Sequence, residues 1–261
     1  MYDCLRKKVV VVTGASQGIG RAIAGAFTRE ECVVYNLDVR RPEAPLPGID
    51  YLKCDVSSEK NVMEAIARIV ERSGGIDILV NNAGIERYNS VGEVPVSEWD
   101  EIIDVNLKGS FLMSKHALPY LLEKGNGVIL FVASIQSNMV QKRDAAYVTS
   151  KHGLLGLARS LAVDYAPSLR TVALCPGTIL TPLQTWCAEQ EVGKDPEKIR
   201  QKLDEWGRMC PMGRQGRPEE VANVAVFMST SYASYITGTC IYIDGGLSSF
   251  VPESAPKSGS A

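Results

Sequence analysis

The sequence predicts an α/β fold: one doubly wound parallel sheet of about seven strands, with helices on both faces and a small helical lid. Three observations predict it. Short runs rich in β-branched residues alternate with stretches of helical periodicity along the whole chain. The strand-like runs are apolar almost throughout, as parallel strands covered on both faces are. No linker, repeat or low-complexity tract divides the chain, so we expect a single domain over residues 1–261.

The strands are expected, in chain order, at residues 9–13, 32–38, 51–54, 76–81, 128–133, 171–175 and 239–243. Strand–helix alternation with right-handed crossovers places them in parallel in a sheet of the Rossmann type. In such a sheet, ligands bind beyond the carboxyl ends of the strands. Motifs that follow directly after a strand are therefore the candidates for a functional site.

Helices are expected at residues 19–29, 59–72, 97–122, 145–166 and 218–229. In the second of these, Val62, Ile66 and Ile69 share one face, and Ser57 and Ser58 stand where a helix N-cap belongs. Two segments do not fit the alternation. Residues 178–215 are long for a connection and carry helix formers, which predicts a substrate lid. The tail, 247–261, is rich in Ser, Pro and Ala, and we expect it to be loosely ordered unless something holds it.

Composition argues against several function classes. Lys and Arg number 28 and Asp and Glu 30, for a net charge of −2, which disfavours a nucleic-acid partner or a cationic membrane-surface protein. The sequence contains no apolar run of transmembrane length and no signal segment, so we expect a cytoplasmic protein with no membrane partner. The 7 cysteines are scattered without a C-x-x-C pair and there are 2 histidines, so neither a metal site nor a disulfide framework is predicted.

A glycine-rich turn joins the first strand to the first helix, with the sequence Thr-Gly-Ala-Ser-Gln-Gly-Ile-Gly. Glycines there let the backbone approach a pyrophosphate, whose charge a helix N-terminus favours. Asp38 ends the second strand, where an acid can bind the adenosine ribose hydroxyls and repel a 2′-phosphate. NAD is therefore the expected cofactor, although Arg40 and Arg41 keep NADP possible. The candidate contacts are Gly14, Ser16, Gln17, Gly18, Ile19, Gly20 and Asp38.

A second constellation lies in the other half of the chain. Tyr147 and Lys151 stand one helical turn apart, and Ser134 follows the apolar run 128–133. A tyrosine base needs a nearby cation, because the pKa of a free phenol is about 10. Lys151 can supply that charge, and Ser134 can hydrogen-bond a substrate oxygen. Together with the glycine turn, this pattern predicts an oxidoreductase.

These motifs together resemble the short-chain dehydrogenase/reductase family over essentially the whole chain. The resemblance implies that Asn106 kinks a helix and holds a proton-relay water near Lys151, so that the catalytic set is Asn106, Ser134, Tyr147 and Lys151. It implies adenine contacts from Asp55 and Val56. Further cofactor contacts, with Tyr147 and Lys151 at the nicotinamide ribose, are implied for Asn82, Ala83, Gly84, Pro176, Gly177, Ile179 and Thr181.

Within that family, several stretches resemble the aldose (aldohexose) dehydrogenases of archaea and bacteria: residues 81–88, 145–152, 178–182, 191–206 and 237–247. The resemblance implies a sugar substrate oxidised at C1 to the lactone, with a glutamate at the Glu86 position binding sugar hydroxyls. It also implies a homotetramer in which the C-terminal tail closes a neighbour's active site. The candidate substrate contacts are Glu86, Ser134, Gln136, Tyr147 and Trp186, with Asn138, Gln141 and Trp206 as further candidates.

Two other functions stay open at this point. One is a reductase of a hydrophobic carbonyl, such as a 3-ketoacyl thioester or a ketosteroid, which Lys142 and Arg143 favour and Asp38 disfavours. The other is a non-catalytic scaffold that binds a dinucleotide. A pure binder has no need of an activated phenol, so Tyr147 and Lys151 argue against the scaffold.

Overall fold

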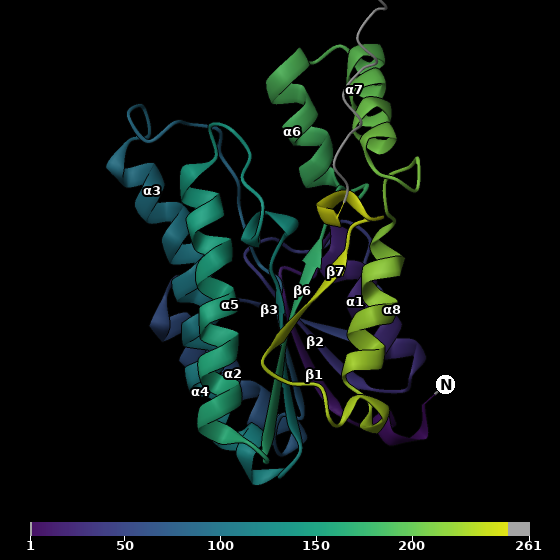
Figure 1. The fold of residues 1–261 in the computed structure, drawn as a ribbon. Helices are drawn as coiled ribbons and strands as arrows, with labels where there is room; N and C mark the ends of the chain where they lie inside the picture. The colour runs from purple at the N-terminus through teal and green to yellow at the C-terminus, as the bar shows by residue number, and fades with distance from the viewer. Residues whose placement is uncertain (1, 250–261) are drawn as a thin grey trace, which may run out of the picture.

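A computed structural model describes residues 2–249. Its centre is a seven-stranded sheet in the order β3-β2-β1-β4-β5-β6-β7, with every neighbouring pair parallel (Figure 1). This confirms the predicted doubly wound sheet. The chain starts in the middle, moves outward to one edge, and returns through β4 to the other edge. The strands are β1 (Val9–Thr13), β2 (Val33–Asp38), β3 (Ile49–Lys53), β4 (Ile78–Asn81), β5 (Gly127–Val132), β6 (Leu169–Pro176) and β7 (Thr239–Ile243).

Strand boundaries differ from the expected ones by at most two residues at either end, as β3 and β6 show. The strand expected at residues 51–54 is β3, which begins at Ile49 and ends at Lys53. Its register is set by pairing with β2, where Ile49 lies opposite Val34 and Leu52 opposite Leu37. Only Leu52 of this strand is buried, because an edge strand faces a neighbour on one side alone. The predicted range, 51–54, overlaps this strand but starts two residues late.

Helices cover both faces of the sheet (Figure 1). Val10 and Val12 of β1 point into the apolar cluster under α1 (Gly18–Arg29) and α8 (Pro218–Met228). Val9 and Val11 point into the opposite cluster. That second cluster is covered by α2 (Glu59–Ser73), α4 (Gly109–Glu123) and α5 (Ala145–Tyr165). All four valines are buried, which explains why the strand is apolar at every position.

The helix expected at residues 97–122 has three parts. An α-helix, α3 (Val96–Ile103), continues into a π-helical segment, Asp104–Lys108, and then into α4. Asn106 lies at the centre of the π-helical segment and is fully buried. The sequence prediction of one continuous helix does not distinguish these three parts. π-bulges such as this one occur frequently at functional sites.

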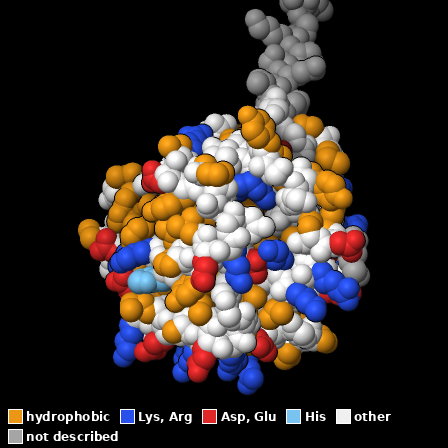
Figure 2. All heavy atoms as spheres, turned by 90° about the horizontal axis from the view of Figure 1, so that it is seen from below, with side chains coloured by type: hydrophobic (Ala, Val, Ile, Leu, Met, Phe, Trp, Pro, Cys, Tyr) orange, Lys and Arg blue, Asp and Glu red, His pale blue; other side chains and the backbone are white. Residues whose placement is uncertain are grey.

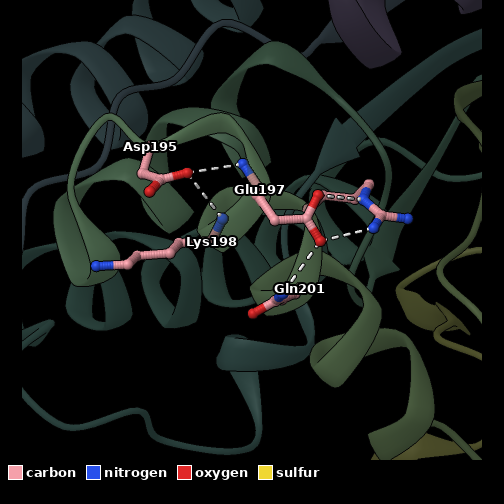
Figure 3. A network of polar contacts seen from close by, with 5 residues as sticks. Asp195, Glu197, Lys198 and Gln201 are labelled. Carbon is pink, nitrogen blue, oxygen red and sulfur yellow. Dashed lines mark hydrogen bonds and ion pairs between the residues drawn. The ribbon is translucent and has the colours of Figure 1, made fainter.

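The segment 178–215 forms two helices beyond the carboxyl ends of the strands, α6 (Pro182–Val192) and α7 (Pro196–Met209) (Figure 1). Both begin with a side-chain cap and a proline. The Thr181 hydroxyl accepts a hydrogen bond from the Gln184 amide, and the Asp195 carboxylate accepts from the Glu197 and Lys198 amides (Figure 3). Glu197 then binds Arg200 and Gln201 one turn on, which fixes the exposed face of α7.

The surface carries charges of both signs. On the face seen in Figure 2, lysine and arginine side chains are interspersed with aspartate and glutamate. No helix within residues 2–249 has the length and apolarity needed to span a membrane. In the same residues, no group of three or more His, Cys, Asp or Glu side chains is arranged to hold a metal ion. Most of the predicted tail, 247–261, lies outside the described residues.

Candidate active site

The glycine turn after β1 is held by the loop after β4. The Asn82 side chain donates hydrogen bonds to the carbonyl oxygens of Thr13 (2.8 Å) and Gly14 (3.1 Å). In return, the Thr13 hydroxyl accepts from the amides of Asn82 and Ala83, at 2.9 and 3.0 Å. A Cβ on Gly20 would collide with the Asn82 side chain and the Gly14 carbonyl. The turn is therefore glycine-rich because two backbone segments approach each other closely.

This turn leads into the N-terminus of α1. Gly14 and Gly18 have positive φ angles of 65° and 57°, which glycine adopts without strain. Gln17 is the N-cap residue and makes no side-chain capping bond, so the first amides of α1 remain available to an anion. Gly18 also faces Thr181, since a Cβ added there would lie 3.6 Å from the threonine side chain. The cradle thus fits the pyrophosphate of a dinucleotide.

Asp38, at the end of β2, completes this cradle. Its carboxylate accepts hydrogen bonds from the Ser16 amide (3.1 Å) and the Arg40 amide (3.0 Å), which fix its orientation. Beside it lies a pocket of 270 Å³ that Arg21, Arg41 and Tyr51 line. The Arg41 guanidinium lies 5.9 Å from the centre of the Tyr51 ring. A fixed acid beside such a pocket fits an adenosine ribose, while the two arginines leave positive charge nearby.

The remaining candidate cofactor contacts surround the same end of the sheet. Asp55 follows β3, and its carboxylate accepts hydrogen bonds from the Ser57 amide and hydroxyl, so it also shapes the turn into α2. Val56 is buried against Gly109. On the other side, Pro176 ends β6, Gly177 packs against Asp244, and Ile179 is buried and bridges to Gly216.

Asn106 connects the π-helical segment to the loop after β4. Its side-chain oxygen accepts from the Ile85 amide (2.8 Å), and its side-chain nitrogen donates to the Ile85 carbonyl (2.9 Å) and the Ser150 hydroxyl (3.1 Å). A Cβ added to Gly84 would lie 3.4 Å from the Asn106 oxygen and 3.5 Å from the Lys151 nitrogen. Asn106 and Lys151 therefore flank Gly84, as expected for members of one site.

Ser134, Tyr147 and Lys151 lie together at the carboxyl end of β5. All three are buried, with exposed fractions of 8%, 8% and 4%. The Lys151 ammonium donates to the Val132 carbonyl at 2.9 Å and lies 5.3 Å from the centre of the Tyr147 ring. Tyr147 and Ser134 form a side-chain hydrogen bond. The structure thus assembles the hydroxyl, phenol and ammonium groups that sequence spacing predicts.

The pKa values of Tyr147 and Lys151 differ from those that the proximity of the two residues alone would predict. Burial raises the pKa of Tyr147 well above its usual value, and the Glu86 carboxylate raises it further, while the Ser134 hydrogen bond works the other way. Burial also lowers the pKa of Lys151 to about 8, against the opposing effect of Glu86. We expected Lys151 to lower the pKa of Tyr147. In this arrangement burial and Glu86 outweigh any such effect.

The candidate substrate residues have different surroundings, and two of them, Glu86 and Trp186, are connected through α6. Glu86 is 6% exposed, and its carboxylate accepts a hydrogen bond from the Cys187 thiol of α6 at 3.6 Å. Trp186 stacks on Tyr88 with 6.3 Å between ring centres. Gln136 lies next to Ser134 and donates to Gln141 at 3.3 Å. Trp206 is on α7, beneath the Lys202 ammonium, and Asn138 is exposed.

Sequence reasoning missed three residues at this site. Asp144 precedes α5 and lies against Glu86, while Tyr88 and Cys187 complete the surroundings of the Glu86 carboxyl. Asp144 stands three residues before Tyr147, the spacing that places two side chains on one side of a helix, and that was the signal available. Nothing in the sequence indicated that Cys187 would contact Glu86, since α6 reaches it from another part of the chain.

Comparison with known proteins decides the family. A family model described as enoyl-(acyl carrier protein) reductase, one of the short-chain dehydrogenase models, matches residues 14–248. The chain belongs to the short-chain dehydrogenase/reductase family. The resemblance drawn from its motifs is thereby confirmed, and the seven-stranded sheet is the one that structures of this family share. The protein is accordingly an oxidoreductase of a family that generally uses NAD(P).

Individual members of the family give finer comparisons. The ligand-free structure of Thermoplasma acidophilum aldohexose dehydrogenase is 47% identical, with a TM-score of 0.95, over 98% of this chain and 100% of that one. Oxidoreductase UcpA of Salmonella typhimurium is 38% identical, over 96% of this chain and 97% of the relative. The 3-oxoacyl-[acyl-carrier-protein] reductase FabG of Thermotoga maritima is 36% identical, over 93% and 98%. These relatives differ in the substrates that their names state.

Proposed function

We propose that this enzyme oxidises the C1 hydroxyl of an aldose, specifically an aldohexose, to the lactone, with hydride transfer to NAD(P)+. The observation that carries the proposal is the buried Glu86 carboxyl, 6% exposed, close enough to Tyr147 to raise the pKa of its phenol. A buried carboxyl beside the reacting position suits a substrate with further hydroxyl groups. A purely apolar substrate would bury this carboxyl further without offering it a hydrogen bond. The similarity to the Thermoplasma aldohexose dehydrogenase supports the same conclusion.

The roles proposed for the catalytic residues follow from their contacts. Ser134 orients the substrate hydroxyl, and the Tyr147 phenol, already hydrogen-bonded to Ser134, takes its proton. Lys151 passes that proton onward, and Asn106, on the other side of Gly84, is proposed to hold the relay water beside it. A bound oxidised nicotinamide dinucleotide supplies the hydride acceptor and a positive charge near the phenol. Because Tyr147 is buried, that proton transfer is shielded from bulk solvent.

NAD is the proposed cofactor, with NADP possible. Asp38 offers its carboxylate to ribose hydroxyls from a position fixed by two backbone amides. The same charge disfavours a 2′-phosphate. Arg21 and Arg41 line the neighbouring pocket and reduce this discrimination. Binding of the dinucleotide is proposed for the candidate contacts named above, from Gly14 to Thr181.

Assembly and location are part of the proposal. We propose a cytoplasmic homotetramer with a small sugar as its substrate, and no nucleic-acid or membrane partner. Residues 178–215 are the proposed substrate lid. Cys187 of this segment already contacts Glu86, and Trp186 lies against Tyr88. A role for the tail, 247–261, concerns residues that lie mostly outside the described ones.

A substrate panel tests the proposal. Purified enzyme is mixed with NAD or NADP and aldoses or secondary alcohols, or with reduced cofactor and 3-ketoacyl thioesters or ketosteroids, and the nicotinamide absorbance is followed. Turnover of aldoses, with lactone as the product, is the expected result. The similarity to FabG makes ketoacyl reduction the second candidate, and turnover of thioesters alone would establish it instead. Nucleotide binding without turnover of any of these substrates would favour the scaffold.

A further inference from the structure

Two buried carboxyl groups from different parts of the chain meet beside Tyr147. Glu86 comes from the loop after β4, and Asp144 immediately precedes α5; their exposed fractions are 6% and 1%. The two side chains lie within hydrogen-bonding reach of each other. A backbone bridge between Asn89 and Asp144 aligns the two segments, so the pairing is built into the fold. Only Glu86 has a role in the function proposed above.

The Asp144 side chain does not cap the helix that follows it, although an aspartate at this position usually does. It is the N-cap residue of α5, where aspartate normally accepts a hydrogen bond from a helix amide, and it makes no such bond. Its carboxyl lies against Glu86 and the Gln136 amide group instead. A side chain that forgoes its capping bond to enter a buried site is better explained by a ligand than by the stability of the helix.

The site holds more hydrogen-bond acceptors than donors. Within residues 2–249, neither carboxylate oxygen of Asp144 has a donor, and neither does the buried side-chain oxygen of Gln136. Leaving a buried acceptor unpaired costs about 1–3 kcal/mol, so folded proteins rarely keep several together. With Asp144 protonated, its second oxygen and the Gln136 oxygen still lack a donor among the described residues, which a ligand with O–H groups can supply.

We propose that Asp144 is a second substrate-binding carboxyl, which together with Glu86 holds one hydroxyl of the sugar between them and thereby determines which sugars are accepted. This inference rests on the function proposed above. Ser134 and Tyr147 bind the reacting hydroxyl. The two carboxyl groups therefore bind a different hydroxyl, on a neighbouring part of the sugar ring. Asp144 is a specificity residue in this scheme and takes no part in the proton transfer.

One proton shared by the pair makes it complementary to a hydroxyl group. Burial raises the pKa of Glu86, while its hydrogen bonds with Asp144, Cys187 and Tyr88 and the charge of Lys151 work the other way. Asp144 has fewer such contacts: burial and the Glu86 charge raise its pKa to about 9, and only the Gln136 amide opposes them. At neutral pH Asp144 therefore carries the proton. A sugar hydroxyl can accept from Asp144 and donate to Glu86 at the same time.

Helix α6 covers the pair. The Cys187 thiol touches Glu86, and Trp186 packs on Tyr88 and lies 5.6 Å from the Arg87 guanidinium. The Asp144 oxygens are shielded from solvent in this arrangement. Binding of a sugar to the pair therefore requires a rearrangement, and α6, which contacts Glu86 through Cys187, is the element proposed to move. The same movement removes the thiol, which leaves Glu86 free to accept from the sugar.

The experiment measures coupling between Asp144 and individual sugar hydroxyls. The aldohexose that the wild type oxidises best is compared with its 2-, 3-, 4- and 6-deoxy analogues, using wild type and Asp144→Ala. At the position that the pair holds, deoxygenation lowers kcat/KM at least tenfold in the wild type and less than threefold in Asp144→Ala, mainly through KM. Asp144→Asn keeps the shape of the side chain and one hydrogen-bond donor. In this variant, deoxygenation at that position should lower kcat/KM by a factor between those of the wild type and Asp144→Ala.

Two controls separate the possible failures. Asp164→Asn changes an exposed aspartate on the same helix and should retain the wild-type pattern. Calorimetric titration of the 1-deoxy sugar, and of its derivatives that lack one further hydroxyl, into the enzyme with reduced cofactor measures the same coupling without turnover, in case a variant is inactive. If the wild type oxidises aldoses but Asp144→Ala alters the effect of removing none of the hydroxyls, the role of Asp144 is overturned and the proposed function stands. A wild type that oxidises no aldose overturns both.

Discussion

The ammonium of Lys151 lies 5.3 Å from the centre of the Tyr147 ring, one turn further along α5, with both side chains buried. Its hydrogen bond to the Val132 carbonyl anchors it to the end of β5. The end of β5 thus fixes the position of the lysine ammonium, and α5 fixes the position of the tyrosine ring. Their relation depends on how α5 packs on the sheet, and not on flexible loops.

Replacing Tyr147 with Phe tests the proposed base. We expect kcat to fall by about 10²–10⁴, the usual contribution of one acid–base group, because the phenylalanine ring fills the same space without a proton acceptor. The affinity for the reduced cofactor, measured by fluorescence titration, should change less than threefold. Tyr235→Phe is the control, since Tyr235 is fully exposed. Wild-type turnover by Tyr147→Phe would remove the tyrosine from the mechanism.

Replacing Asp38 with Asn tests the cofactor preference. The amide keeps the shape but loses the charge that repels a 2′-phosphate, while Arg21 and Arg41 remain nearby. The ratio of kcat/KM for NADP over NAD should rise at least tenfold, which corresponds to about 1.4 kcal/mol. Asp50→Asn, at an exposed position lining the same pocket, is the matched control. An unchanged ratio would mean that Asp38 does not select the cofactor.

The fold was more predictable from sequence than the site. Strands buried on both faces, such as β1, are apolar at every position and are found directly. The edge strand β3 begins two residues earlier than predicted, because its start is fixed by pairing with β2, and the π-helical segment around Asn106 was predicted as part of one long helix. Asp144 was missed for another reason. Its role depends on contact with Glu86, a residue from a distant part of the chain.

The proton on Asp144 should make stability depend on pH. The pKa of this carboxyl is raised from 3.8 to about 9, so the folded protein retains a proton that the unfolded chain has released. Stability therefore falls as pH rises between about 4 and 9, by at most about 1.4 kcal/mol per pH unit for one proton. Asp144→Asn should flatten this slope, and its Tm should exceed that of the wild type increasingly from pH 5 to 8. Asp164→Asn should retain the wild-type slope.

Replacing Asn106 with Ala removes three hydrogen bonds from a fully buried side chain. The amide and carbonyl of Ile85 would lose their partner, and an unpaired buried group costs about 1–3 kcal/mol. We expect a Tm several degrees lower and a reduced kcat, since the loop that carries Gly84 would be released next to Lys151. Asn126→Ala, in an exposed turn, should change neither quantity. A normal Tm would show that Ile85 finds other partners.

Glycine replacement tests the close approach within the dinucleotide cradle. A methyl group at Gly20 would collide with the Asn82 side chain and the Gly14 carbonyl. Gly20→Ala must therefore displace the Asn82 clamp, the set of hydrogen bonds by which Asn82 holds the glycine turn after β1. The KM for the cofactor should rise at least tenfold. Gly156→Ala is the matched control, because it also adds a methyl group to a helix but meets nothing within 4 Å. That variant should bind cofactor normally and gain up to about 1 kcal/mol in stability from its higher helix propensity. Normal cofactor binding by both variants would show that the Asn82 clamp does not shape the cradle.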